Sequence, residues 1–370
     1  MNIYHFFQGN MVHISPEVIK SFLISKGRDK LCLNENDKFV FVITMFEKKV
    51  IHGDLKEDPY TPLFKEYEHT DFILVNSEKD YLRIIRNIAP SDKIVFHSWP
   101  PFRLFIKLNV FLLLFRRRLL SRCSYICWGS DFKIADGGLK TWFSRIILQF
   151  SFNRYAFVDT LTSAEVDELK ALYPKANVVN ALYPSSSRYV FKEKIHSNGD
   201  KPTVMVSHSG WPHNYHLHSF DLLSQFKGKI QVVCPLCYGD EAYINEVIER
   251  GQSVFGSDFH FFTELKDRED YKEFLRTIDI YVTSAETQTG LGAIFYSMES
   301  GTKIFIKGDL LTSLAGQNYI VFDTESIKDI DFDNFSKPLK KDEAIANIDN
   351  LNLIKYEGAD YLNVWRQIVG

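Results

Sequence analysis

The sequence is poor in cysteine and methionine, with 5 of each in 370 residues. An odd, sparse set of cysteines in a chain of this length argues against a disulfide framework and favours a reducing compartment. Cys234 and Cys237 form a Cys-x-x-Cys pair, which redox and zinc sites use. A zinc site would need a second pair of similar spacing, and Cys123 and Cys127 lie four apart. We therefore expect Cys234 and Cys237 to be core residues.

Long hydrophobic runs are also missing. The longest, "VFLLLF" at 110–115, is far below the roughly 20 residues that a membrane-spanning helix needs. The first positively charged residue is Lys20, and no small-residue cleavage site follows an apolar stretch near the start. These absences predict a cytoplasmic protein, unless it docks on a membrane from that side.

An excess of basic residues is missing as well. The chain has 44 Lys and Arg against 47 Asp and Glu, a net charge of −3, so nucleic acid is not an expected partner. A hydrophobic content of 45% and a charged content of 25% are ordinary for a soluble globular protein. A length of 370 residues suits two domains of about 150–200 residues each.

Short apolar runs alternate with longer amphipathic segments, twice over. The expected strands are 2–7, 39–45, 72–75, 93–98, 124–128 and 155–158, then 203–208, 230–234, 259–262, 279–283, 303–306 and 319–322. The expected helices are 15–26, 78–88, 102–120, 138–152 and 163–172, then 214–226, 241–251, 268–277, 290–300 and 341–350. Such alternation predicts an α/β fold with two doubly wound, Rossmann-like domains.

A polar stretch with Ser, Gly and Pro separates the two series and predicts a linker. We expect an N-terminal domain at 1–185, the linker at 186–202 and a C-terminal domain at 203–350. Residues 351–370 resemble a closing helix, which could pack on the N-terminal domain. Two such domains facing each other would place the carboxyl ends of both sets of strands at one cleft, where ligands bind.

A glycine-rich turn, "TQTGLG", follows the strand expected at 279–283 and opens a helix. Thr289, Gly290 and Gly292 would let a diphosphate approach the backbone amides at the positive end of that helix. A turn without a ligand is an equally good interpretation. Glu286 could bind a sugar or ribose hydroxyl, or be a solvated loop charge.

A histidine-rich segment, "HSGWPHNYH" at 208–216, follows the first strand of the second series. Ser209 and Gly210 predict a tight turn, and Asn214 is a good N-cap for the next helix. The histidines have no spacing typical of a zinc site and no acidic partner, so we expect a ligand-contacting loop and no metal. His208 and His213 have no assigned role at this point.

Two candidate bases lie in the first half. In "WGSD", Trp128, Gly129 and Asp131 follow a strand, and Asp131 could take a proton from an acceptor hydroxyl, or could simply cap the next helix. His97 ends another strand and is the second candidate base, or a buried histidine with its hydrogen bonds satisfied.

One stretch, 101–123, is strongly basic and carries Arg116, Arg117 and Arg118 among Phe and Leu. A basic amphipathic helix of this kind is typical of a membrane-surface element attracted to anionic lipid. A buried crossover helix with charged ends would give the same pattern.

Taken together, these motifs resemble glycosyltransferase family 56, the bacterial Fuc4NAc transferases that act on a lipid-linked oligosaccharide in enterobacterial common antigen synthesis. "WGSD" is similar to the family's Trp-Gly-Ala-Asp, and "TQTGLG" to its Gln-Gln-Gly-Ile-Gly. "SHSGWPHNYH" is similar to a family segment with Ser-Gly and Asn-x-His, and "EAYINEV" to Glu-Ala-Tyr-Ile-Glu-Glu-Val. This chain departs from the family at His208, Trp211, Pro212 and Tyr215.

The resemblance implies a GT-B architecture and metal-independent transfer of a hexose, in the family an acetamido-dideoxy one. The donor would be a TDP- or UDP-linked sugar, with no other cofactor. The acceptor would be a lipid-linked or other glycan in bacterial surface polysaccharide synthesis, reached by a protein peripheral at the inner face of the cytoplasmic membrane. Carried over, the donor-side residues are Ser209, Gly210, Asn214, His216, Tyr238, Glu241, Tyr243, Thr289, Gly290 and Gly292, and the acceptor-side residues are Trp128, Gly129 and Asp131.

Two rival functions fit the same architecture. One is a sugar-nucleotide epimerase or hydrolase, which would turn over the donor without an acceptor. The other is a non-catalytic protein that binds a nucleotide sugar.

Overall fold

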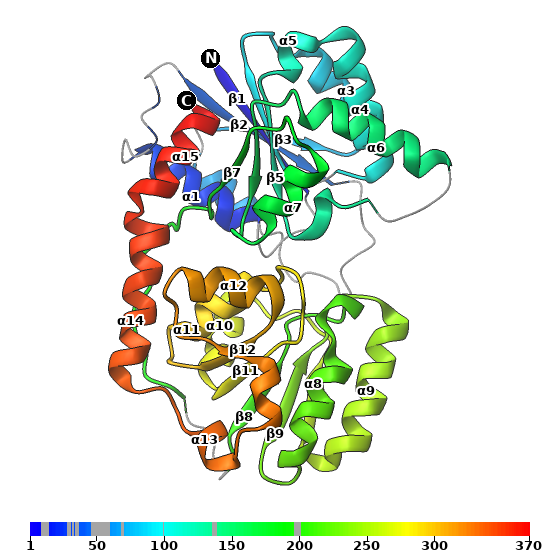
Figure 1. Ribbon diagram of the computed structural model, residues 1–370. Helices are drawn as coiled ribbons and strands as arrows, with labels where there is room; N and C mark the ends of the chain where they lie inside the picture. Colours follow the sequence, from blue (N-terminus) through cyan, green and yellow to red (C-terminus); the bar gives the residue numbers. More distant parts are fainter. Residues whose placement is uncertain are drawn as a thin grey trace. The chain divides into compact units, whose positions relative to one another are not determined.

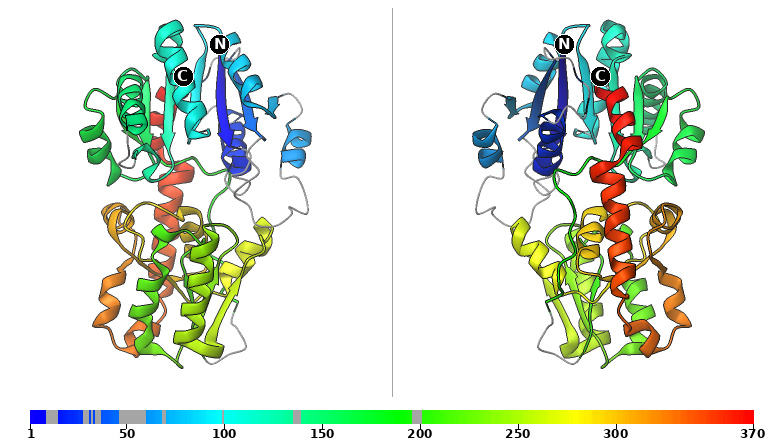
Figure 2. Two further views of the ribbon diagram at one scale, coloured as in Figure 1. Left: turned by 90° about the vertical axis from the view of Figure 1, so that its right-hand side faces the viewer. Right: turned by 90° about the vertical axis from the view of Figure 1, so that its left-hand side faces the viewer.

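The computed structural model describes residues 1–8, 15–27, 31, 33, 37–45, 60–67, 70–98, 100–134, 139–195 and 201–370. These residues form two compact units, each a parallel sheet with helices on its faces (Figures 1 and 2). The first unit consists of the described residues up to Ser187 together with Ile354–Gly370, and the second of Arg188–Leu353. The chain thus passes to the second unit after Ser187 and returns after Leu353.

The first unit has a seven-stranded sheet in the order β3-β2-β1-β4-β5-β6-β7, with every pair parallel. Its strands are β1 (Asn2–Gln8), β2 (Lys38–Thr44), β3 (Asp71–Val75), β4 (Lys93–His97), β5 (Cys123–Cys127), β6 (Phe157–Thr160) and β7 (Val178–Asn180). Its helices are α1 (Ser15–Gly27), α2 (Tyr60–Glu66), α3 (Glu78–Asn87), α4 (Phe102–Phe115), α5 (Arg117–Leu120), α6 (Leu139–Phe152), α7 (Glu165–Leu172) and α15 (Ala359–Val369).

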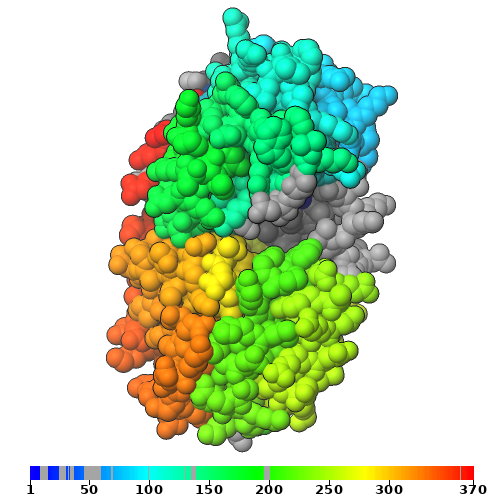
Figure 3. Space-filling model, turned by 45° about the vertical axis from the view of Figure 1, so that its right-hand side comes forward, coloured from blue at the N-terminus to red at the C-terminus, as the bar shows by residue number. Residues whose placement is uncertain are grey.

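The second unit has a six-stranded parallel sheet in the order β10-β9-β8-β11-β12-β13. Its strands are β8 (Thr203–Val206), β9 (Gln231–Pro235), β10 (Phe259–Phe262), β11 (Ile280–Val282), β12 (Lys303–Ile306) and β13 (Phe322–Asp323). Its helices are α8 (His216–Leu223), α9 (Glu241–Phe255), α10 (Arg268–Arg276), α11 (Leu291–Met298), α12 (Gly308–Gly316), α13 (Phe332–Ser336) and α14 (Lys341–Asn352). α8 and α9 lie on its surface in green and yellow-green (Figure 3).

The predicted α/β class with two doubly wound sheets is confirmed, because both sheets extend in both directions from their first strand. Element bounds differ in places. The helix expected at 102–120 is broken at Arg116, whose ψ of 44° ends α4 before α5 begins. The strand expected at 155–158 runs instead from Phe157 to Thr160. Most of the strand expected at 319–322 is also absent, since β13 begins only at Phe322.

Two backbone hydrogen bonds place part of the expected linker. The Lys192 amide donates to the Glu299 carbonyl and the Ile195 amide to the Arg276 carbonyl, so this part of the expected linker lies against the second unit.

Cys234 and Cys237 are buried free thiols. Among the described residues, no helix is both long and apolar enough to cross a bilayer.

The C-terminal helix α15 is anchored in the first unit by Trp365, which is fully buried. The Trp365 Nε1 donates to the Leu182 carbonyl at 2.9 Å. Its ring meets Phe22 of α1 edge-on at 4.9 Å between centroids and stacks on Tyr183 at 5.3 Å. Helix α15 is therefore part of the core of the first unit.

We predict that Trp365→Ala lowers the free energy of unfolding of the first unit by about 3–5 kcal/mol, because it leaves a large cavity and an unpaired carbonyl. Leu114→Ala is the matched control, since Leu114 is 62% exposed and its loss should change stability by less than about 0.5 kcal/mol. Denaturant titration followed by circular dichroism measures both. Equal midpoints for the two variants would contradict the packing described for α15.

Candidate functional site

The second sheet reverses its winding direction between β8 and β11, and polar residues follow both strands at their carboxyl ends. Ser207 comes directly after β8 and has a left-handed φ of 57°. Its Oγ lies 3.0 Å from the Oγ1 of Thr283, which directly follows β11. Ligands of open α/β sheets bind at such a reversal, and a left-handed non-glycine residue is a form of strain that gathers at functional sites.

The turn at Ser209 and Gly210 is held tightly against the start of α9. The Gly210 amide donates to the Tyr238 carbonyl at 2.8 Å, and Gly210 pairs with Gly239 in a short parallel bridge. A Cβ at position 210 would lie 2.2 Å from the Cγ1 of Ile244. Only glycine therefore allows this close approach.

His208 joins the two polar turns of the second unit. Its Nε2 lies 3.2 Å from the Ser209 Oγ and 3.4 Å from the Thr289 Oγ1. Gly290 has a left-handed φ of 67°, and a Cβ there would lie 2.6 Å from the His208 Nδ1. The sequence assigned no role to His208. The structure places it between the serine turn (residues 207–210) and the glycine turn (residues 287–292).

The expected N-cap role of Asn214 is wrong. Asn214 ends a short 3-10 helix (Pro212–Asn214), and the residue that precedes α8 is Tyr215, with φ 50° and no side-chain cap. The Asn214 Nδ2 instead donates back to the Ser209 carbonyl at 2.6 Å and to its Oγ at 2.9 Å. Its Oδ1 is buried and has no hydrogen-bond partner among the described residues. Asn214 thus braces the serine turn.

His216 is buried at the first position of α8, and Tyr243 of α9 packs beside it at 5.7 Å between ring centroids. The His216 backbone amide donates to the Tyr243 hydroxyl at 3.0 Å. Burial, with His208 and His213 nearby, lowers the pKa of His216 to about 3, so the ring is neutral. Neither ring nitrogen has a partner within the described part of the chain.

The remaining donor-side candidates differ in their exposure and in their hydrogen-bond or ion-pair partners. Tyr238 is half-buried beside Ser209, and burial raises its pKa to about 12 against a hydrogen bond to Ser209. Glu241 is exposed on the first turn of α9. Glu286 is also exposed, and its carboxylate forms an ion pair with Lys307 at 2.7 Å.

Lys307 belongs to a row of charges that follows β11, β12 and β13. It contacts Glu325 at 3.0 Å, and Glu325 also accepts from His218 of α8 at 2.7 Å. Hydrogen bonds from Lys328, His218 and Lys307 lower the pKa of Glu325 to about 2, and the two carboxylates raise the pKa of Lys307. Glu286 is therefore paired within the unit.

Helix α11 presents an open first turn. Gly290 precedes it without a side-chain cap, and the first amides of any helix lack intrahelical acceptors. Gly292 is exposed, and no atom lies within 4 Å of where its Cβ would be. Thr289, Gly290 and Gly292 thus leave room for an anion at the positive end of α11.

The described residues contain no cluster of three or more His, Cys, Asp or Glu side chains that could hold a metal ion. An Asp-x-Asp pattern does occur, at Asp329, Asp331 and Asp333. Asp331 precedes α13 as its N-cap, and its Oδ1 accepts from the Asn334 amide at 2.7 Å. This pattern therefore has a structural role.

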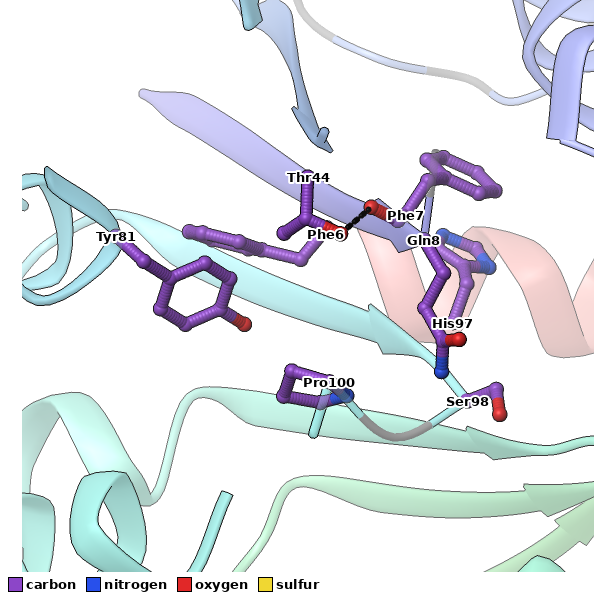
Figure 4. A pocket seen from close by; sticks show the side chains of 8 residues that line it. All are labelled: Phe6, Phe7, Gln8, Thr44, Tyr81, His97, Ser98 and Pro100. Atoms are coloured by element: carbon purple, nitrogen blue, oxygen red, sulfur yellow. Dashed lines mark hydrogen bonds between the residues drawn. The ribbon is translucent and has the colours of Figure 1, made fainter. Parts of the chain in front are cut away.

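The first sheet reverses direction between β1 and β4, and a small pocket lies at that reversal (Figure 4). The Thr44 hydroxyl donates to the Phe7 carbonyl across its upper wall at 3.3 Å. Tyr81 of α3 is fully buried, and its hydroxyl points into the pocket without a partner among the described residues. The lining residues are Phe6, Phe7, Gln8, Thr44, Tyr81, His97, Ser98 and Pro100.

His97, the second candidate base, is fully buried and belongs to a chain of hydrogen bonds. Trp128 Nε1 can only donate, and it donates to the Tyr183 hydroxyl at 2.7 Å. That hydroxyl lies 2.7 Å from His97 Nδ1, and His97 Nε2 lies 2.9 Å from His5 Nδ1. These contacts link Trp128, Tyr183, His97 and His5 in one chain, in which the tautomer of each histidine sets the donor at the His97 contacts.

Both ring nitrogens of His97 are therefore occupied. Burial, reinforced by His5, holds the pKa of His97 well below its usual range, and burial lowers that of His5 to about 3. The Phe7 ring stacks on the His97 ring at 4.0 Å with 5° between their planes. This environment gives His97 the role of orienting Tyr183 and Trp128, so the expectation of a free base at His97 does not fit the geometry.

Asp131 lies at the carboxyl end of β5, in a short 3-10 helix (Ser130–Phe132). The Tyr125 hydroxyl donates to its Oδ2 at 2.7 Å. Burial raises the pKa of Asp131 to about 6, against the lowering effect of hydrogen bonds from the Trp128 backbone, Tyr125 and Ser98. Its Oδ1 is buried and has no hydrogen-bond partner by geometry within the described residues.

The basic stretch is divided between the core and the surface. The Arg116 guanidinium donates to the carbonyls of Arg86, at 2.6 Å, and Ile88, and so caps the end of α3. Arg117 and Arg118 are exposed. Leu104, Phe105, Leu108 and Leu112 of α4 are fully buried, as in a crossover helix of the core.

Sequence patterns missed the residues that act through distant contacts. His5 and Tyr183 meet His97 across 92 and 86 residues, and no local pattern signals such pairings. Ser98, like Ser207, has a left-handed φ, here 64°. It directly follows β4 at the sheet reversal, whereas the sequence placed it inside a strand at 93–98.

No family model and no curated protein sequence matches this chain. Solved structures do resemble it over its whole length. A glycosyltransferase from Rickettsia africae ESF-5 matches with a TM-score of 0.62 and 13% identity, over 99% of this chain and 98% of that one. Anabaena Alr3699/HepE in complex with UDP-glucose matches with a TM-score of 0.62 and 12% identity, over 100% and 98%.

An α,α-trehalose-phosphate synthase (UDP-forming) from Burkholderia vietnamiensis matches with a TM-score of 0.55 and 11% identity, over 99% of this chain and 97% of that one. At such identities the likeness defines the fold. The chain therefore has the α/β GT-B architecture that the sequence predicted.

We predict that Gly290→Ala destabilises the second unit by roughly 1–2 kcal/mol or more, since alanine resists a left-handed φ and its Cβ would collide with His208. Gly292→Ala is the matched control two residues away, where the space is open, and it should keep or slightly raise stability. Thermal unfolding of both variants measures the difference. Equal loss in the two would contradict the geometry of this turn.

Proposed function

We propose that this protein is a glycosyltransferase, which moves a hexose from a UDP- or TDP-linked donor to a glycan acceptor. The observation that carries the proposal is the reversal of the second sheet, where the serine turn, His208 and the open start of α11 converge. Backbone amides at a helix start suit a diphosphate, and unpartnered polar atoms of His208 and Asn214 suit further ligand contacts. The fold shared with HepE, solved with UDP and glucose, supports this function.

The proposed reaction assigns separate work to the two units. In the second unit, the start of α11 would stabilise the negative charge that develops on the departing nucleoside diphosphate. In the first unit, Asp131 would accept the proton of the acceptor hydroxyl whose oxygen attacks the anomeric carbon. Trp128, held by Tyr183, would form part of the acceptor surface beside Asp131. We propose that transfer needs no metal ion.

The acceptor that we propose is a lipid-linked glycan in bacterial surface polysaccharide synthesis, used by a peripheral protein at the inner membrane face. The sequence resemblance to family 56 supports this acceptor and makes an acetamido-dideoxy hexose the first donor sugar to test. A donor-only assay separates transfer from epimerisation or hydrolysis, which would consume the donor without an acceptor.

The nucleotide can be named by a thermal-shift screen with UDP, TDP, GDP and CMP. A ligand that binds only the folded state at 100 times its Kd adds about 2.7 kcal/mol to the free energy of unfolding. We expect UDP or TDP to give the largest shift. Gly292→Ala, which costs no stability, should reduce that shift because its methyl group enters the space left for the diphosphate. No shift with any of the four nucleotides would contradict the proposal.

Asp131→Asn should lower the transfer rate by roughly 10²–10⁴-fold while leaving the nucleotide shift intact.

With Asp131 present, the rate should rise with pH through about 6, because only the ionised carboxylate accepts a proton. Since folding raises this pKa, ionisation destabilises the native state as pH rises from about 4 to about 6. As pH rises over that range, the free energy of unfolding of Asp131→Asn should therefore fall less than that of the wild type. An unchanged rate would exclude Asp131 as the base, whereas nucleotide binding without transfer by the wild type would favour a non-catalytic binding protein.

A further inference from the structure

Helix α6 of the first unit turns its apolar side toward solvent. Leu139 is 73% exposed, Trp142 54%, Phe143 53% and Phe150 52%. Spacings of three, four and eleven residues from Leu139 place all four on one helical face. The opposite, buried face includes two serines, Ser144 and Ser151, next to Leu148 and Phe152. An ordinary surface helix keeps its solvent side polar, whereas α6 has large apolar residues on both faces.

The sequence around this stripe is rich in basic residues. Residues 100–158 carry ten Lys and Arg against two acidic residues, although the whole chain has slightly more acidic than basic ones. On α6 itself, Lys140 and Arg145 are exposed. Arg154 follows the helix, and its guanidinium lies 5.4 Å from the centre of the Phe150 ring. Neither α4 nor α6 contains Asp or Glu.

Helix α4 packs against α6, and its last turn also exposes apolar residues. Leu114 is 62% and Phe115 71% exposed at the last turn of α4, followed by exposed Arg117 and Arg118. The part of the basic stretch that the structure leaves accessible is therefore its end, while the middle of α4 is core. α6 lies on the outside of the first unit, coloured blue-green in Figure 3.

We propose that α6, with the last turn of α4, docks the first unit on an anionic lipid bilayer. Leu139, Trp142, Phe143 and Phe150 would enter the boundary between headgroups and acyl chains, and the flanking Lys and Arg would contact anionic headgroups. Trp at such a boundary is typical, because its ring is apolar and its N–H polar.

The position of α6 relates this surface to the candidate base. α6 is the crossover from β5 to the parallel strand β6, so its first turn lies at the carboxyl edge of the sheet, the edge where β5 leads to Asp131. Arg145 of α6 donates to the Ile134 carbonyl at 2.6 Å, which ties the helix to the segment after Asp131. The first turn of α6, with Leu139 and Trp142, thus lies at the same edge as Asp131. The docking rests on the proposed function only in the expectation that the acceptor is lipid-linked.

Vesicle co-sedimentation tests the docking directly. The protein should bind vesicles of phosphatidylcholine with phosphatidylglycerol more strongly than vesicles of phosphatidylcholine alone. The double variant Trp142→Ser with Phe143→Ser should lose at least about tenfold in binding to the anionic vesicles. Phe261→Ser, at a residue 40% exposed in the second unit, is the matched control and should bind as the wild type does. Thermal unfolding checks that all variants are folded, as expected for exposed positions.

Two further measurements separate the outcomes. Replacing Arg117 and Arg118 by Gln should reduce binding to the anionic vesicles but not to the neutral ones. Vesicle binding by the double variant equal to that of the wild type would overturn the proposal, as would wild-type protein that binds neither vesicle. If the wild type dimerises without binding vesicles and the double variant stays monomeric, the stripe contacts a second copy of this chain. The nucleotide thermal shift, measured without vesicles, is independent of all these results, so failure of docking and failure of the transferase proposal are distinguishable.

Discussion

Both sheets extend in opposite directions from their first strand, and the candidate site depends on the gap that this reversal leaves at the carboxyl edge. A serine with left-handed backbone follows a strand at each reversal, Ser98 after β4 and Ser207 after β8. The left-handed turn redirects the chain away from the sheet directly after the strand. In the second unit, this brings His208 against the glycine turn; in the first, Ser98 lines the pocket beside His97.

Polar groups at these edges are held in place before any ligand arrives. The side-chain amide of Asn214 donates to Ser209, and His208 links Ser209 with Thr289. In the first unit, the chain from Trp128 through Tyr183 and His97 to His5 fixes the indole of Trp128. Such preorganisation reduces the ordering that binding and catalysis would otherwise require.

The fold could be predicted largely from sequence, because buried parallel strands are continuous apolar runs and the crossover helices between them are long. Where prediction failed, tertiary contacts overrode local patterns. Asn214 has the chemistry of an N-cap, but its amide bonds to Ser209 instead. His97 has the position of a base, but His5 and Tyr183 occupy both its nitrogens. The exposed apolar residues of α6 depart from the usual assumption that the apolar side of a helix faces the core, so only the structure separates exposed from buried residues here.

The most direct test of the account is backbone hydrogen exchange of the intact protein with and without UDP, or TDP if that nucleotide gives the larger thermal shift. The account predicts that the nucleotide slows exchange at the first turn of α11, residues 291–294, and at the serine turn, residues 207–210. Protection confined to other segments of the chain, with these two unchanged, would contradict it.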